Sequence, residues 1–283
     1  MSERPGLPAM QPFFLDTVRG TRFCLYHAPP TGTECRGAFL YIHPFAEEMN
    51  KSRRMAALQA RAFAATGFAV LQIDLFGCGD SAGEFGNARW EIWKEDLAAA
   101  RQWLVERVAA PVHLWGLRLG ALLALDFARS RGDAIDSIVL WQPVMRGESF
   151  MTQFLRLRLA DDMLAGRAEQ NGGTRALRDA LARGEALEIA GYDIAPALAA
   201  EIDTLDAAAW SGIGSAIHWF EISADANRPL PHASAQLIAA WRDEGADVRL
   251  HPVQGAPFWS APEIAECPEL LSATAAIFHP VHA

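Results

Sequence analysis

Short apolar runs alternate with amphipathic helical patterns along residues 37–141, and this alternation limits the chain to one fold class. The runs are typical of strands buried on both faces of a parallel sheet. They are "GAFLYIH" (37–43), "FAVLQID" (68–74), "PVHLW" (111–115) and "AIDSIVLW" (134–141), with helical patterns at 52–67, 89–108 and 119–130 between them. The sequence therefore predicts an α/β fold with a mostly parallel central sheet and helices on both faces. We expect the first helix to begin at Ser52 as N-cap and to end at Gly67.

The alternation stops after Pro143, where mostly helical sequence takes its place. Sheet and helix patterns return later, at 216–223, 247–253 and about 263–278. We therefore expect an α/β core formed by residues 1–145 and 213–283. Residues 146–212 are expected to be a helical cap inserted into this core.

Composition argues against several classes of protein. The 283 residues carry a net charge of -9 with no basic stretch to offset it, which argues against a nucleic-acid partner. No apolar segment approaches the roughly 20 residues that span a bilayer, and "MSERPGLPAMQPFF" lacks the features of a secretory signal. The four cysteines have no metal-ligand spacing. We expect a cytoplasmic protein without metal, cofactor or membrane span.

Gly116 and Gly120 frame Arg118 in "WGLRLGA", between a predicted strand and a predicted helix. This is the spacing of Gly-x-Ser-x-Gly, a sharp strand-to-helix turn known as the nucleophile elbow. Larger side chains two residues either side of the apex would make strand and helix clash. The frame therefore predicts an elbow with an arginine at its apex.

Four further segments fall in a fixed order around this elbow. They are "IHPF" (42–45), "DLFGCGDSAGEF" (74–85), "SADANRP" (223–229) and "VQGAPFW" (253–259). Together with the elbow they resemble the α/β-hydrolase superfamily over nearly the whole chain. The resemblance places Arg118 at the nucleophile position, Asp225 at the acid position and Pro257 at the histidine position.

Longer strings carry a narrower resemblance. The segments "HPFAEEMNKSRRM", "LWGLRLGALLAL", "WQPVMRGESF" and "GAPFWSAPEIAECPEL" resemble the exosortase A system-associated hydrolase 2 family. That resemblance implies the label hydrolase and an association with bacterial loci for exopolysaccharide synthesis and export sorting. Proteins of the exopolysaccharide and exosortase system are the partners that it implies.

The residues at the three triad positions argue against the chemistry of the superfamily. Acyl transfer by a Ser-His-Asp triad needs a hydroxyl or thiol that an imidazole deprotonates. A guanidinium stays protonated and cannot attack a carbonyl, and a proline ring cannot move a proton. The standard mechanism is therefore excluded, and our leading hypothesis is a non-catalytic binding or scaffolding protein. The alternative is an ester or thioester hydrolase that uses other groups in the same cleft.

Arg118 itself has two interpretations. It is either a structural plug, paired with Asp225 and with Glu47 or Glu48 as rival partners, or a site for an anion. The second interpretation rests on the backbone N–H groups at a helix N-terminus, which already favour negative charge, and on the guanidinium beside them. The ligand would then be an anionic or acylated small molecule or a glycan.

The remaining candidates lie around the same predicted edge of the sheet. His43 is expected to be a structural histidine bonded to backbone, Ser81 and Cys78 to be turn residues, and His251 is considered as a displaced base. Glu47, Glu48, Asn50 and Lys51 form a polar cluster, either a solvated face or part of a ligand site. We expect Trp259 and Trp141 near the cleft. The candidate binding residues are Arg118, Asp225, His43, Phe45, Glu47, Leu119 and Trp259.

Overall fold

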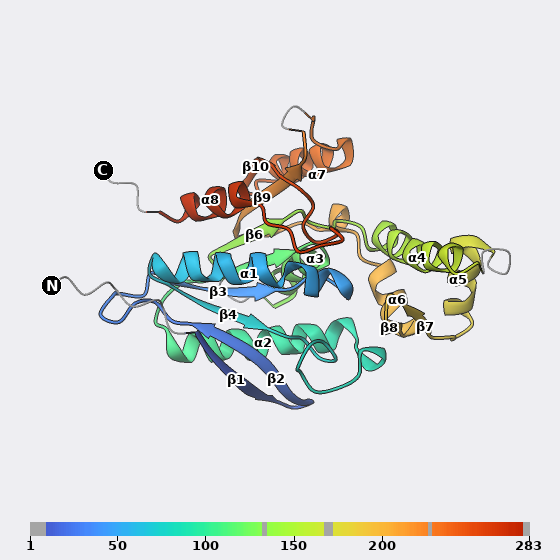
Figure 1. The fold of residues 1–283 in the computed structure, drawn as a ribbon. Coiled ribbons are helices and arrows are strands. Elements are labelled where there is room, and N and C mark those ends of the chain that lie inside the picture. The colour runs from blue at the N-terminus through green and yellow to red at the C-terminus, as the bar shows by residue number, and fades with distance from the viewer. Residues whose placement is uncertain (1–9, 132–134, 167–171, 226–227, 280–283) are drawn as a thin grey trace.

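A computed structural model describes residues 10–131, 135–166, 172–225 and 228–279 of the chain. Its centre is one eight-stranded sheet, shown in Figure 1. The strand order is β1 (Met10–Thr17), β2 (Gly20–His27), β4 (Phe68–Ile73), β3 (Gly37–Ile42), β5 (Val112–Leu117), β6 (Ser137–Trp141), β9 (Ala216–Ser223), β10 (Val248–Gln254). From β4 to β10 all neighbours are parallel, whereas β1, β2 and β4 pair antiparallel. The predicted mostly parallel sheet is confirmed.

Side chains along the buried strands alternate between the two faces of the sheet, which is why these strands are apolar throughout. Phe39 of β3 packs in a cluster with Phe63 of α1 (Glu47–Ala65) and Leu270 of α8 (Pro268–Ile277). Leu40, the next residue of β3, packs in the second cluster with Leu97 of α2 (Trp90–Arg107). That cluster also contains residues of α3 (Leu119–Arg131) and α7 (His232–Asp243).

The segment expected as a cap contains α4 (Gly147–Leu164), α5 (Gly173–Ala182), α6 (Pro196–Asp203) and a hairpin of β7 (Leu187–Ile189) and β8 (Tyr192–Ile194). In Figure 1 it projects from one side of the sheet, away from both chain ends. Several contacts tie it to the core. Tyr192 packs on Phe85 with ring centroids 5.0 Å apart, and Glu201 accepts a 2.8 Å hydrogen bond from the backbone N–H of Trp90.

Two predicted helix limits need correction. The first helix begins at Glu47, five residues before Ser52, so Ser52 is a buried residue inside the helix and no N-cap. Its expected end is confirmed, since Gly67 follows the helix with a φ of 93° that glycine adopts without strain. The last helix begins at Pro268, about five residues later than predicted.

None of the helices in the described part of the chain is long and apolar enough to cross a membrane.

Candidate functional site

The predicted elbow is present. Strand β5 ends at Leu117 and α3 begins at Leu119, which leaves Arg118 at the apex with a φ of 56°. A Cβ at Gly116 would lie 2.5 Å from Ala121 Cα, and one at Gly120 would lie 2.4 Å from the His43 carbonyl oxygen. Only glycine fits at these two positions, so the frame is a steric requirement of the turn. The strained apex is held by backbone bonds, among them the 3.0 Å bond from Arg118 N–H to the Trp141 carbonyl.

The side chain of Arg118 pairs with Glu48 in the first turn of α1. Its Nε donates to Glu48 Oε1 at 3.2 Å, and the two side chains are only 16% and 11% exposed. Its guanidinium carbon also lies 5.4 Å from the ring centroid of Trp259, within the range of a cation–π contact. The expected pairing with Asp225 is wrong, and the rival partner Glu48 holds the arginine. Asp225 is exposed and lines a different pocket, with Glu221 and Arg228.

Burial strongly perturbs Glu48. It raises the pKa of this carboxyl to about 7, a rise to which Glu47 adds and which Arg118 and Lys51 oppose. The second oxygen, Oε2, is buried without a hydrogen-bond partner among the described residues. Glu48 therefore keeps its proton to a higher pH than an ordinary glutamate does. Burial raises the pKa of Glu47 as well.

The loop after β10 faces the elbow through Trp259. Pro257, at the histidine position, is exposed, and its carbonyl accepts from Ser260 N–H at 3.0 Å. Phe258 and Trp259 follow it into the interior, and the expected place of Trp259 near the cleft is confirmed.

The backbone of Trp141 lies beside the elbow, where its carbonyl accepts from Arg118 N–H, but its side chain does not face the cleft. Its side chain is fully buried, and its Nε1 donates to Thr274 Oγ1 of α8 at 2.9 Å. Its ring also packs edge-on against Trp115 at 4.8 Å. Trp141 therefore belongs to the core between sheet and helices.

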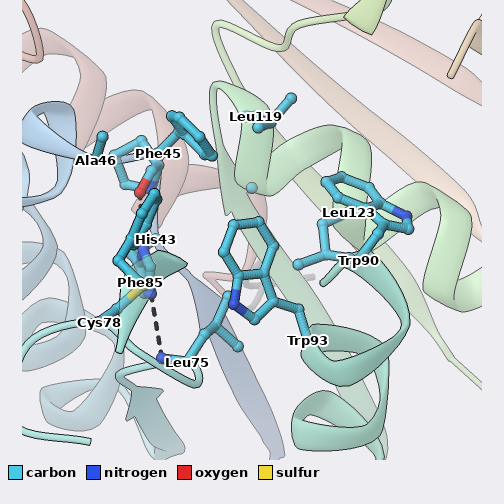
Figure 2. Close-up of a pocket in the computed structure, with 12 residues that line it drawn as sticks. His43, Phe45, Ala46, Leu75, Cys78, Phe85, Trp90, Trp93, Leu119 and Leu123 are labelled. Carbon is cyan, nitrogen blue, oxygen red and sulfur yellow. Dashed lines mark hydrogen bonds between the residues drawn. The ribbon is translucent and has the colours of Figure 1, made fainter. Parts of the chain in front are cut away.

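Beside the elbow, His43, Phe45 and Leu119 line a small apolar pocket. Figure 2 shows Phe45 and Trp93 facing the same space as Leu119. The rings nearly fill this space, and a cavity of about 10 Å³ remains, which has room for about one water. An acyl chain does not fit there.

His43 is structural, as expected. Its Nδ1 lies 2.7 Å from the Pro44 carbonyl and therefore carries the proton, while Nε2 accepts from the backbone N–H of Leu75 at 3.3 Å. Burial lowers the pKa of this imidazole and keeps it neutral. With both ring nitrogens in use, His43 is not a free base.

The other candidates for displaced chemistry are also occupied. Ser81 Oγ donates to the Asp74 carbonyl and accepts from the backbone N–H of Phe23. Cys78 is buried, and burial raises the pKa of its thiol well above the usual range. His251 lies on β10, where its Nε2 is 3.2 Å from Nδ1 of His218. None of these side chains pairs a nucleophile with a base in the cleft.

A serine, a histidine and an aspartate do meet elsewhere, at the amino-terminal ends of β5 and β6. His113 Nδ1 lies 2.8 Å from Ser137 Oγ and 3.4 Å from Asp136 Oδ2. Both partners face the same ring nitrogen, whereas a triad needs the hydroxyl on one nitrogen and the carboxylate on the other. This end of the sheet is also opposite the elbow, so the trio does not replace the missing triad.

A larger groove opens between the elbow, the cap helix α4 and α7, with a volume of about 520 Å³. Its lining mixes apolar and polar groups; the polar residues are Arg118, Arg146, Ser149, Gln153, Asp206, Ser234 and Gln236. Arg146 is paired with Asp206 at 3.0 Å. Sequence reasoning missed every one of these residues except Arg118, because no local motif signals a groove formed by packing of distant helices.

The fold and the elbow together define a protein of the α/β-hydrolase superfamily. Residues 33–179, more than half of the chain, match the family described as Serine aminopeptidase, S33, and the chain belongs to this family. The serine in the family's name has no counterpart at the apex, where this chain has Arg118.

Solved structures agree on the fold. Est1E from Butyrivibrio proteoclasticus with ferulic acid bound has a TM-score of 0.64 and 13% identity, over 94% of this chain and 97% of that chain. Mouse alpha/beta hydrolase domain-containing protein 10 has a TM-score of 0.64 and 14% identity, over 94% and 98%. A carboxyl esterase from Bacillus coagulans in complex with glycerol has a TM-score of 0.62 and 14% identity, over 95% and 97%. No curated protein matches the chain.

Proposed function

We propose that this protein is a non-catalytic member of its superfamily that binds an anion-bearing ligand in the groove beside Arg118. The observation that carries the proposal is the residue at the apex of the elbow. A guanidinium stands where acyl transfer needs a hydroxyl, and it is fixed there by Glu48 and Trp259. An arginine so placed binds and orients charge but does not attack a carbonyl.

Three features favour an anion as the ligand. Only Nε of Arg118 makes a hydrogen bond within the described residues, which leaves Nη1 and Nη2 for another acceptor. Helix α3 begins at the next residue, so its N-terminal N–H groups add to the positive potential. The 520 Å³ groove has the volume for a small organic molecule and a mixed polar lining. A small polar anion suits it better than a long acyl chain.

The biological setting follows from the longer sequence strings. We propose that the protein acts in the cytoplasm alongside the bacterial exopolysaccharide and exosortase system, as its resemblance to the exosortase A system-associated hydrolase 2 family implies. Deleting the gene should then alter exopolysaccharide or sorted surface proteins. Restoring the Arg118→Met variant should fail to correct the defect.

Activity assays test the non-catalytic part of the proposal. A fluorophosphonate probe should not label the purified protein, and the protein should not accelerate hydrolysis of p-nitrophenyl acetate. An authentic serine esterase in the same assay is the positive control. Labelling or turnover that persists in Arg118→Met would contradict the proposal.

The second candidate function is hydrolysis of an ester or thioester by non-standard groups. Glu48 favours it, because a buried carboxyl with a pKa of about 7 has the basicity of a general base at neutral pH. Loss of turnover in Glu48→Gln, with unchanged fluorophosphonate reactivity, would support this alternative.

A further inference from the structure

The ion pair at the elbow has features of a proton-linked switch. Glu48 is the internal counterion of Arg118, yet a carboxylate accepts up to about four hydrogen bonds and Glu48 accepts one from a side chain, at 3.2 Å. Its Oε2 is buried without a partner among the residues that the structure describes. The ionised form of Glu48 is thus poorly solvated and stabilised mainly by the charge of Arg118.

A ligand anion at Arg118 would remove that stabilisation. The guanidinium would then lie between two negative groups in a largely buried site, where like charges repel more strongly than in water. The charged groups that act on Glu48 are Arg118 from the elbow and Glu47 and Lys51 from its own helix, while Trp259 from the facing loop brings no charge. Lys51 is the other cation of this set, and its charge acts on Glu48 more weakly than that of Arg118, which alone of the two donates a hydrogen bond to Glu48 within the described residues.

Resting on the proposed function, we propose that binding of an organic anion at Arg118 is coupled to the uptake of one proton from solvent by the Glu48 carboxylate. The proton converts Glu48 to the neutral acid, so Arg118 exchanges its internal counterion for the ligand and the net charge of the site is unchanged. Burial supports this, because it already holds the pKa of Glu48 at about 7 before any ligand binds. The ligand class is a monoanion that stays ionised at neutral pH, such as a carboxylate or sulfonate, on a small polar body that fits the groove.

The linkage predicts a definite pH profile. Below pH 7 Glu48 is mostly protonated in the free protein, so affinity changes little. Above pH 7 each binding event takes up a proton, and the Kd rises by up to about tenfold per pH unit until the raised pKa of the complex is reached.

The test uses benzenesulfonate, whose own charge is constant between about pH 5.5 and pH 8.5. Its Kd is measured from amide chemical shifts of Leu119 and Gly120, and methyl phenyl sulfone is the uncharged ligand control. In the wild-type protein the Kd should rise above pH 7. In Glu48→Gln it should stay at the low-pH value throughout. Glu95→Gln, which removes an exposed glutamate paired with Arg19, should keep the wild-type slope.

The outcomes separate this inference from the proposed function. Arg118-dependent binding with a flat wild-type profile, or with a slope that survives in Glu48→Gln or vanishes in Glu95→Gln, overturns proton coupling and leaves the anion site standing. Equal binding by Arg118→Met, or no binding by wild type, overturns both. A readout that does not depend on a variant is the carboxyl ¹³C shift of Glu48, which should move to the neutral-acid value when ligand saturates the protein near pH 7.5.

Discussion

Arg22 and Arg118 both pair with a buried carboxylate, and they differ in their access to a cavity. Arg22 of β2 is fully buried; its Nε donates to Asp96 at 2.7 Å, and its Nη1 donates to three backbone carbonyls. Arg118 makes one side-chain hydrogen bond within the described residues and lines a 520 Å³ groove. Arg22 is enclosed by protein on all sides, and its Nη2 is buried without a hydrogen-bond partner among the described residues, whereas Arg118 lines a groove that a ligand can enter. This contrast favours the anion site over the plug.

The two carboxylates differ in how many of their oxygens are paired. Asp96 accepts from Arg22 through one oxygen and from the backbone N–H of Phe76 through the other, at 2.7 Å each. Glu48 has one oxygen paired and one buried without a partner in the part of the chain that the structure describes. Burial raises the pKa of both, to about 6 for Asp96 and about 7 for Glu48. We therefore expect the Arg22–Asp96 pair to stabilise the fold and the Arg118–Glu48 pair to take part in ligand binding.

The largest expected effect is on stability at the first pair. Asp96→Asn should lower the free energy of unfolding by about 3–5 kcal/mol at pH 7.5, because it leaves Arg22 buried without a counterion. In addition, the NH2 group of the asparagine would face one of the two donors, Arg22 Nε or the Phe76 backbone N–H, that now bond to the carboxylate. Urea unfolding followed by tryptophan fluorescence measures it. Glu95→Gln is the matched control, since its ion pair with Arg19 is exposed and should contribute less than about 1 kcal/mol. Equal losses in the two variants would contradict the structural role of Arg22.

The next effect is on the pH dependence of stability. A carboxyl whose pKa is raised on folding contributes stability that is complete below its unfolded value, near 4.5, and is lost as pH rises through its folded value of about 7. Glu48→Gln should remove this decline, so the difference in unfolding free energy between pH 4.5 and pH 7.5 should shrink by about 1–3 kcal/mol. Urea unfolding at the two pH values provides the measurement. Glu95→Gln should leave the decline as it is, and an unchanged decline in Glu48→Gln would be the contrary result.

A smaller effect is expected when the second arginine is removed. Arg118→Met should cost less than about 1 kcal/mol of unfolding free energy at pH 6, because Glu48 becomes neutral by taking up a proton and no buried charge is left alone. Arg22→Met, which strands Asp96, is the comparison in the same urea experiment. A loss above about 3 kcal/mol in Arg118→Met would make this residue a structural plug like Arg22.

The fold and the elbow could be predicted from sequence because their signals are local. The apolar runs predict the strands, and the spacing of Gly116 and Gly120 predicts the elbow. Gly116 is required by close approach to Ala121 across the turn, and Gly120 by close approach to the carbonyl of His43 just after β3. The choice of Glu48 over Asp225 and Glu47 as the partner of Arg118 could not be predicted, because it depends on where α1 begins. A start at Ser52 leaves Glu48 in a loop, whereas the observed start at Glu47 draws Glu48 into a buried first turn beside the elbow.

The buried position of the Trp141 side chain could have been predicted from the sequence. Trp141 shares the parity of Val139 along β6, and both face the cluster that contains Phe63. Strand alternation alone therefore places its ring in the core. The groove had no such signal, because residues of the elbow, α4 and α7 line it from distant parts of the chain.

The smallest effect is expected when the missing triad members are restored. The double variant Arg118→Ser with Pro257→His should hydrolyse p-nitrophenyl acetate at most a few times faster than Arg118→Ser alone. Asp225 is exposed and lines a separate pocket with Arg228, so it is poorly placed to orient an imidazole at residue 257. The apolar pocket of about 10 Å³ also gives an acyl group no room. Initial rates at equal protein concentration decide this, and a gain above about a hundredfold, the scale of general-base catalysis, would show that the cleft has kept catalytic geometry.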